Sequence, residues 1–442
     1  MVKGKVIDIN IRKEKKSQEH EKIIKLFKFG LHKQAMISEE GELIETWFIA
    51  LKDRKTNVTL ELTPYTKLLR YSTKSIDSRQ SETIRSRGVF LCMFLNYILI
   101  DNYERFQLDD IKNVAIEHGN SFLRAYAYGE IGRKEKTINT VEIAIDKLTQ
   151  VYIAIKAVYK KEANFIYKKN FYEKDARGKQ RIIIPFKIEG KSNLVNDFEI
   201  FRDMPECIFW KFLDLSKVYY PELTFAIALQ AFAGLRPGEV CNVRQAISPV
   251  GESIKYQRVG TKLRNFEINL QHKYKMRNDM VDVGSIKVKR KQKVYPKYLP
   301  LIDELYKRHL EILQTYELED GCYPMFVGCN GKAITVKSYR EKIQRLINKY
   351  LRTELLKSDD NILRHYGEIL TQKTLSPHFL RHFFTVRLVL DDLQAPLIAY
   401  WRGDRSLDTA LHYCRNKEEL RNAIYDSNVK VVETILRGVE ID

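Results

Sequence analysis

The chain has 442 residues and a hydrophobic content of 44%, which is enough for two or three domains that each bury a core. Lysine and arginine number 76 against 57 acidic residues, for a net charge of +19, and this excess favours a polyanionic partner such as nucleic acid. The 6 cysteines form no C-x-x-C pair and no apolar leader precedes them, so the sequence predicts a reduced, intracellular chain without disulfide framework or zinc knuckle. We expect no membrane span, because polar residues interrupt apolar stretches such as 89–100.

Residues 1–75 are predicted to form a small basic segment. The stretches 43–51 and 56–62 are rich in β-branched and aromatic residues, and Asp53 to Lys55 between them provide turn residues. A β-hairpin is therefore expected. Its role is open between a packing element and an accessory or arm-type DNA-binding unit.

Residues 76–170 have a helical pattern throughout. Helices are expected over 82–100, with Ser81 as N-cap, over 111–128 and over 137–159, where apolar positions recur in steps of three and four. This pattern predicts a compact all-α domain.

Residues 171–197 are charged and lack a helical period, as is typical of an interdomain linker. The second domain, 198–442, is predicted to be mainly α with a small antiparallel β insert. Its expected helices are 209–220, 221–233, 301–316, 335–356, 377–390, 395–401, 406–413 and 417–436, and its expected strands are 266–275, 285–291 and 293–298.

Three motifs of the second domain carry reactive side chains: Ala233–Val240 (AGLRPGEV), Ser376–Phe383 (SPHFLRHF) and Gly403–Tyr413 (GDRSLDTALHY). Transfer of a phosphodiester needs fixed guanidinium groups that face the non-bridging oxygens, which Arg236 and Arg381 can provide as bidentate forks. It also needs a nucleophile that leaves a stable ester, such as a tyrosine, and an acid for the departing 5′ oxygen. Each residue taken singly has a plainer interpretation, such as a helix-end ion pair, but their occurrence together favours this chemistry.

The three motifs resemble, in order and spacing, the boxes of the tyrosine recombinase or phage integrase family. Those boxes read about T-G-L-R-x-x-E-[LV], H-x-L-R-H and G-H followed by a tyrosine, and the resemblance covers residues from about 76 to 442. It implies an all-α, SAM-like core-binding domain followed by a tyrosine-recombinase catalytic domain.

The resemblance also implies the roles of the site residues. Arg236 and Arg381 would clamp the scissile phosphate, His378 would act as acid, base or phosphate ligand, and Tyr413 would attack the phosphorus. Glu239 would support the first arginine. The general acid would be Lys289, with Lys291 close behind and Lys287 also open, since period-two alternation places all three on one face.

Two positions depart from the family pattern. Ala233 replaces the usual threonine, and Asp404 replaces the usual histidine or tryptophan after the glycine of the third box. A carboxylate there would repel phosphate unless it is protonated or paired with Arg402 or Arg405. The missing donor would then be Trp401, Arg405 or His412, or the chemistry is weakened. His382 is interpreted as a packing residue rather than a catalyst, although contact with phosphate stays open.

The resemblance further implies double-stranded DNA with inverted-repeat core sites as partner. It implies a homotetramer in the synaptic complex, and a monomer or weak oligomer when free. Neither metal, cofactor nor ATP is expected, and neither is a membrane. The protein would be cytoplasmic, encoded by a bacterium, phage or mobile element, and associated with the nucleoid when bound. The alternatives are a catalytically impaired DNA-binding protein and a strand transferase like the type IB topoisomerases or telomere resolvases.

Overall fold

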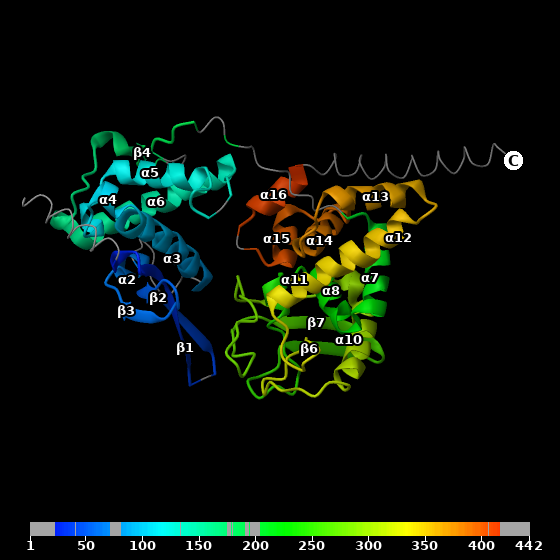
Figure 1. The fold of residues 1–442 in the computed structure, drawn as a ribbon. Helices are drawn as coiled ribbons and strands as arrows, with labels where there is room; N and C mark the ends of the chain where they lie inside the picture. Colours follow the sequence, from blue (N-terminus) through cyan, green and yellow to red (C-terminus); the bar gives the residue numbers. More distant parts are fainter. Residues whose placement is uncertain are drawn as a thin grey trace, which may run out of the picture. The chain divides into compact units, whose positions relative to one another are not determined.

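The computed structural model describes residues 23–39, 41–70, 81–132, 134–174, 178, 180–190, 194, 204–404 and 406–415 (Figure 1). The chain divides into two compact units. The first comprises Met1–Met36 with Ile44–Glu199, and the second comprises Ile37–Leu43 with Ile200–Asp442.

The first unit contains a three-stranded sheet in the order β1 (Phe27–Ile37), β2 (Leu43–Asp53), β3 (Thr59–Leu62). β2 and β3 are antiparallel and cover the two stretches from which a hairpin was expected, with Ala50 opposite Leu62. Ile49 of β2 is fully buried and packs in one hydrophobic core with Leu68 and Leu69 and with the helices that follow. The N-terminal segment therefore shares the core of the helical region and does not form a separate body.

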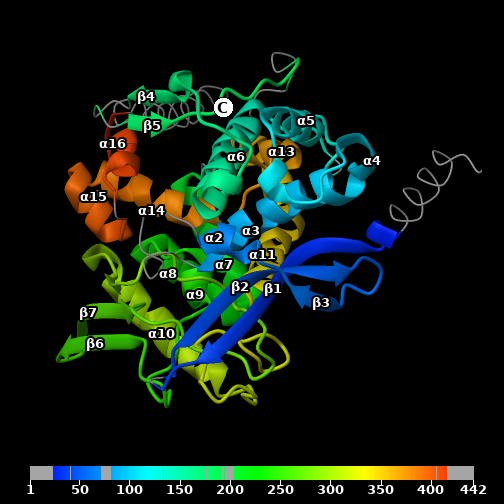
Figure 2. The ribbon, with the colours of Figure 1, turned by 90° about the vertical axis from the view of Figure 1, so that its left-hand side faces the viewer.

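The helices of the first unit gather on one side of this sheet (Figures 1 and 2). They are α2 (Thr66–Arg70), α3 (Ser81–Asn96) with a π-helical turn over Tyr97–Asp101, α4 (Tyr103–Phe106), a 3-10 turn over Ile111–Asn113, α5 (Ile116–Ala127) and α6 (Ile138–Tyr159). Phe94, Phe122 and Tyr152 are fully buried at the centre, because the apolar faces of α3, α5 and α6 meet there. Thr83–Asp101 is long and apolar enough to cross a membrane by length and composition alone, but 56% of its apolar 18-residue window is buried inside the structure, as in a core helix.

Part of the predicted linker packs on the first unit. β4 (Tyr172–Lys174) pairs with β5 (Gln180–Ile182), and Phe171 and Ile184 are buried in the core of the helices. The interpretation of 171–197 as a linker is therefore wrong for its first part. Phe171 and the short apolar run Ile182–Phe186 provide the anchors, and they are too short and too far apart to give a helical period.

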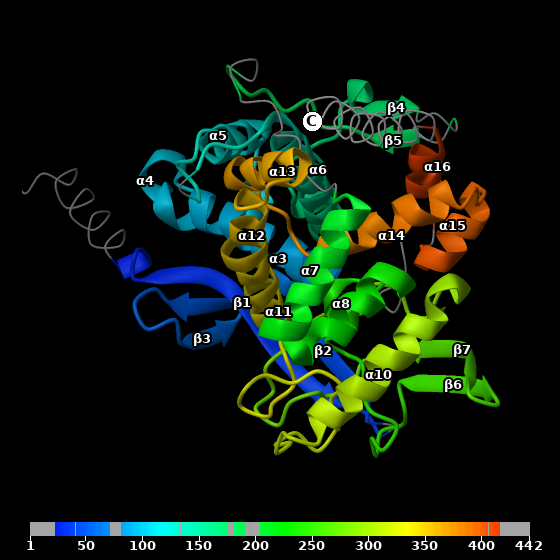
Figure 3. The same cartoon turned by 90° about the vertical axis from the view of Figure 1, so that its right-hand side faces the viewer.

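The second unit is built around α8 (Pro221–Ala233), which contacts α7 (Glu206–Tyr219), α10 (Leu299–Leu313) and α14 (His378–Leu390) (Figure 3). Every residue of α8 after Pro221 is buried, which explains why the helix is apolar on all sides. The remaining helices are α9 (Pro237–Val240), α11 (Val336–Arg345), a π-helical turn over Leu346–Leu351, α12 (Arg352–Leu356), α13 (Asn361–Gln372), α15 (Ala395–Arg402) and α16 (Asp408–Arg415). α13 was not predicted, and the expected helix at 417–436 lies outside the described residues.

A three-stranded antiparallel sheet with the order β6 (Ile254–Val259), β7 (Lys262–Asn269), β8 (Lys291–Lys293) covers one side of this helical core. The mainly α fold with a small β insert is thus confirmed, but the expected strands at 285–291 and 293–298 reduce to three residues. The segment between β7 and β8 instead bonds to a neighbouring loop. Asn278 N donates to Asp320 Oδ1 at 2.8 Å, and Val336 N donates to Val283 O at 2.8 Å. These bonds give backbone groups of the segment between β7 and β8 partners outside a sheet.

Candidate active site

Arg236 lies in a sharp turn at the C-terminal end of α8. Gly234 ends that helix in the left-handed region, with φ of +63°, and a Cβ on it would lie 2.7 Å from the Phe384 ring. Arg236 is then the N-cap of α9, where its backbone N donates to Glu239 Oε2 at 2.9 Å and its Nη1 donates to Glu239 Oε1 at 3.0 Å. The Glu239 side chain is fully buried, so the turn fixes the direction of the Arg236 guanidinium.

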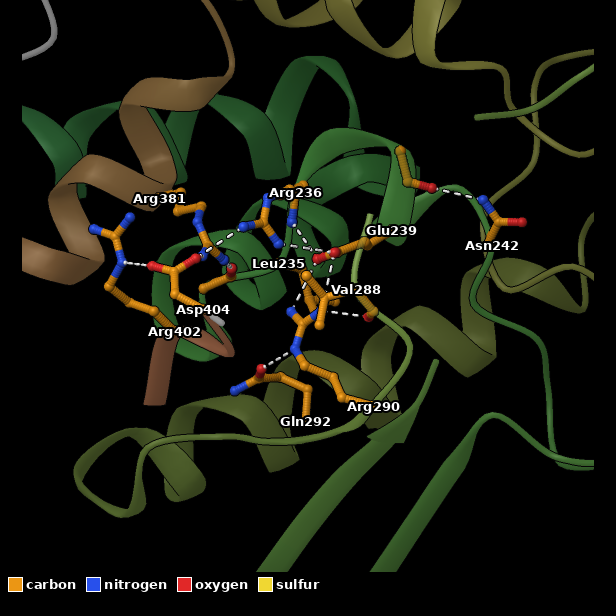
Figure 4. A network of polar contacts seen from close by, with 12 residues as sticks. Leu235, Arg236, Glu239, Asn242, Val288, Arg290, Gln292, Arg381, Arg402 and Asp404 are labelled. Carbon is orange, nitrogen blue, oxygen red and sulfur yellow. Dashed lines mark hydrogen bonds and ion pairs between the residues drawn. The ribbon is translucent and has the colours of Figure 1, made fainter. Parts of the chain in front are cut away.

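Arg381 comes from the opposite side, from the first turns of α14. It is 4% exposed, and its Nη1 donates to the carbonyl oxygen of Gly234. Its Nη2 donates to Asp404 Oδ1 at 2.6 Å, and Arg236 Nη2 donates to the same oxygen at 2.8 Å (Figure 4). Two arginines from distant parts of the sequence therefore converge on one carboxylate oxygen.

Arg402 completes the set of cations around this carboxylate. Its Nε donates to Asp404 Oδ2 at 2.7 Å, and its Nη1 donates to the hydroxyl of Thr385 on α14. The Asp404 carboxylate is thus paired with arginines, and one of them is the Arg402 that the sequence suggested as its partner. The side chains of Arg405 and His412, the other donors considered there, lie outside the described residues.

The charges of the cluster shift one another's pKa. Burial alone would raise the pKa of Asp404, but Arg381, Arg402 and Arg236 outweigh it and hold the pKa below its usual value. The carboxylate is therefore ionised at neutral pH, which removes the protonated alternative. Burial together with Arg236 and Arg402 lowers the pKa of Arg381 to about 9, even though Asp404 counteracts them.

Tyr413, on α16, lies beside the same cluster. Its hydroxyl is 2.5 Å from His382 Nδ1, and its ring centroid is 5.4 Å from the guanidinium carbon of Arg402. Tyr413 and Trp401 also pack against a small apolar cluster that includes Phe384. The interpretation of His382 as a packing residue is therefore incomplete, because it hydrogen-bonds the candidate nucleophile.

The candidate lysines point away from the cluster. The Lys289 side chain is 60% exposed and pairs at 2.6 Å with Glu42, which belongs to the second unit. Lys291 is 50% exposed and 4.0 Å from Glu267, and Lys287 is also exposed. Lys287, Lys289 and Lys291 share one face of the segment, as the period-two alternation predicted, but this face is exposed to solvent. His378 begins α14 with an exposed side chain.

The sequence interpretation missed Arg290, which lies between these lysines on the inner face. It donates to both oxygens of Glu239, at 2.9 and 3.0 Å, and its Nε donates to Gln292 Oε1 at 2.6 Å. Gln292 in turn donates to the carbonyl oxygen of Trp401 at 2.7 Å. The period-two alternation from Lys287 to Lys291 was the available signal, but it was used only for the lysines. Among the described residues, no group of three or more His, Cys, Asp or Glu could hold a metal ion.

Neither a family model nor a curated protein matches this chain. Solved structures do match it. The XerH site-specific recombinase bound to palindromic difH substrate is 16% identical, with a TM-score of 0.46, over 79% of this chain and 82% of that one. A Tn1549 transposon integrase in complex with transposon right end DNA is 16% identical, with a TM-score of 0.47, over 81% and 98%. A lambda integrase dimer bound to a COC' core site is 11% identical, with a TM-score of 0.39, over 76% and 89%. These matched structures, all at low identity, are of site-specific recombinases and integrases, and the three sequence motifs of this chain resemble the boxes of the same family.

Proposed function

We propose that this protein is a tyrosine-type site-specific DNA recombinase, which cuts and rejoins DNA strands through a 3′-phosphotyrosyl intermediate. The observation that supports it is the convergence of Arg236 and Arg381 on Asp404 Oδ1, with Tyr413 beside the same cluster. A carboxylate oxygen between two guanidinium groups occupies the kind of position that a non-bridging phosphate oxygen takes. The Asp404 carboxylate therefore marks where the scissile phosphate would bind.

The cleavage step uses the residues around that position. The Tyr413 oxygen attacks the phosphorus, its proton passes to His382, and a P–O bond to Tyr413 forms while the bond to the 5′ oxygen breaks. Arg236 and Arg381 stabilise the negative charge that develops on the non-bridging oxygens. The departing 5′ oxygen takes a proton from His378 or from a lysine of the 287–291 segment, whose side chain would have to turn from its exposed position toward the DNA. Attack by a 5′ hydroxyl reverses the step and joins the strands.

Binding of DNA requires Asp404 to leave the position between the two arginines. Arg236 and Arg381 donate to one oxygen of Asp404, and Arg402 donates to the other. Rotation of the Asp404 side chain can therefore free Arg236 and Arg381 to bind phosphate while Arg402 keeps its bond to the carboxylate. Arg402 thereby holds the displaced carboxylate. In the family's pattern this position carries a donor, so Asp404 is the feature in which this chain differs most.

The partner that this site fits is duplex DNA, and phosphate contacts would make binding strongly dependent on salt. Inverted-repeat core sites, a homotetramer at synapsis and action inside a bacterial cell are part of the same proposal. The second candidate is a DNA-binding protein without turnover. The observation that favours it is the ionised Asp404 at the phosphate position.

A nicked suicide substrate separates the candidates. The wild-type protein should form an SDS-stable protein–DNA adduct in EDTA, and Tyr413→Phe should form none. Tyr400→Phe, which removes the hydroxyl of an exposed tyrosine, is the matched control and should retain the adduct. Binding without adduct would contradict the proposed activity and support the non-catalytic candidate, whereas an adduct without strand exchange would support a topoisomerase-like activity.

A further inference from the structure

Arg290 is the only side chain of the described 285–291 segment that donates to Glu239. Each Glu239 oxygen accepts from both arginines: Oε1 from Nη1 of Arg236 and Nη1 of Arg290, Oε2 from the backbone N of Arg236 and Nη2 of Arg290. A planar guanidinium suits this two-pronged contact, which an ammonium cannot reproduce. The carboxylate is thus fixed at both ends.

The contact decides the direction of Arg236. Burial alone would raise the pKa of Glu239, but Arg290 and Arg236 hold it below the usual value, so Glu239 stays ionised. With Glu239 immobilised, Arg236 uses Nη1 and its backbone N for the carboxylate and keeps Nη2 for the anion position. Without Arg290, the buried Glu239 would keep Arg236 as its one ion-pair partner among the described residues and could draw the guanidinium away from that position.

Arg290 also supports the turn that carries Asp404. Its Nε bonds Gln292, which donates to the carbonyl oxygen of Trp401. Gly403 has φ of +63°, and a Cβ on it would lie 1.9 Å from Arg290 Nε, so the backbone of the third motif packs directly on this guanidinium. One side chain therefore braces the turn after α8 and the turn after α15.

The cluster has more positive than negative groups, which favours binding of an anionic substrate. Four guanidinium groups, from Arg236, Arg290, Arg381 and Arg402, surround two carboxylates, Glu239 and Asp404. Arg290 is 11% exposed and is bound to Glu239 and Gln292, while the arginines on Asp404 Oδ1 are Arg236 and Arg381. Arg290 therefore acts through other residues.

We propose that Arg290 is a positioning residue for strand cleavage: through Glu239 it aims Arg236 at the scissile phosphate, and through Gln292 and Gly403 it fixes the turn that borders it. This role rests on the proposed function. It predicts a defect in the chemical step and not in DNA affinity, because the groups that contact phosphate remain present.

The test is single-turnover adduct formation on the nicked substrate with saturating protein, using Arg290→Met, Arg290→Lys and the control Arg264→Met, which removes an exposed arginine from β7. Arg290→Met should lower the rate constant about 10- to 100-fold, as misplacement of a catalytic group by about 1 Å does. The fraction of protein that reacts and the Kd for DNA should stay within about threefold of wild type. Arg290→Lys should recover only a small part of the rate, and Arg264→Met should match wild type.

Four results would count against the inference or its basis. If Arg290→Met lowers the reacting fraction but not the rate constant, the residue only maintains folding and the positioning role is wrong. Full rate in Arg290→Lys would also overturn it, since a charge without the fork would then suffice. If wild-type protein forms no adduct at all, the proposed function itself fails, whereas a normal adduct in both wild type and Arg290→Met refutes the role of Arg290 alone.

Discussion

Helix α8 and the charged cluster at its C-terminal end both have residues withdrawn from solvent, but by opposite means. Within α8, Phe225 packs among Phe266, Tyr306 and Phe326, and its burial stabilises the fold through apolar contact. In the cluster, Glu239 and Arg381 are just as buried, but each burial is possible because a partner of opposite charge is in reach. The apolar contacts of α8 stabilise the fold, whereas the cluster holds Arg236 and Arg381 so that both guanidinium groups face the same position, which Asp404 Oδ1 occupies.

The largest expected effect on the rate of strand cleavage is the loss of Arg236. Arg236→Met should lower the rate constant of adduct formation by about 100- to 1000-fold, because one donor to the transition-state oxygens is removed. Glu239 keeps its two bonds to Arg290, so the free energy of unfolding should change by no more than about 1–2 kcal/mol. Single-turnover kinetics and urea denaturation of the same preparation measure both quantities. A large loss of stability with an unchanged rate constant would show that Arg236 serves the fold, as the residues of α8 do, and not strand cleavage.

Phe225→Ala should show the reverse behaviour. Phe225 is 1% exposed, and its truncation should lower the free energy of unfolding by about 3–5 kcal/mol. The folded fraction should still form adduct with the wild-type rate constant, because the residue lies two turns before Gly234. A rate constant reduced more than tenfold at full folding would show that the apolar core also sets the geometry of the site.

A smaller effect, of opposite sign, is expected at Asp404. Asp404→Asn removes the charge that competes with phosphate for Arg236 and Arg381, so duplex DNA should bind about tenfold more tightly, equivalent to about 1.4 kcal/mol. The control Asp408→Asn removes an exposed charge from the start of α16 and should leave affinity unchanged. Weaker binding by Asp404→Asn would mean that the carboxylate assists DNA binding and does not compete with it.

The smallest effect concerns pH. Because Arg381 has a pKa of about 9, it is charged at pH 7–8 and loses its proton as the pH rises past 9. In the Tyr413→Phe background, which removes titration of the phenol, DNA affinity should be level between pH 7 and 8 and fall about fivefold by pH 10. The same titration on Arg381→Met in that background should lack this fall, and an equal fall in both variants would assign it to another group.

The apolar region could be predicted from sequence, because periodicity and composition decide which helices are buried. The limits of α8 agree with the expected 221–233, and α14 begins one residue after the expected start. The motifs also placed Arg236, Arg381 and Tyr413 in one site, through family resemblance and not through local pattern. Long, strongly apolar elements are the ones for which local signals suffice.

The rest depended on contacts between distant segments. Arg290 contacts Glu239 because the chain before β8 lies against the turn after α8, and the period-two alternation separates Arg290 from the lysines without showing which of the two faces is the inner one. The 171–197 stretch looked like a linker because it is charged and lacks a helical period, yet Phe171 and Ile184 within it are buried. Asp404 was recognised as a departure, but its binding of three arginines follows from the tertiary arrangement alone.

The central claim is that Arg236, Arg381 and Tyr413 act on one phosphorus atom. The most direct measurement is mass spectrometry of the adduct after trypsin and nuclease digestion. We expect a nucleotide attached through phosphate to Tyr413, on the peptide of residues 406–415, and its absence in Arg236→Met and Arg381→Met sampled within the wild-type reaction time. A nucleotide on any other residue, or cleaved DNA without a protein-linked phosphate, would contradict it.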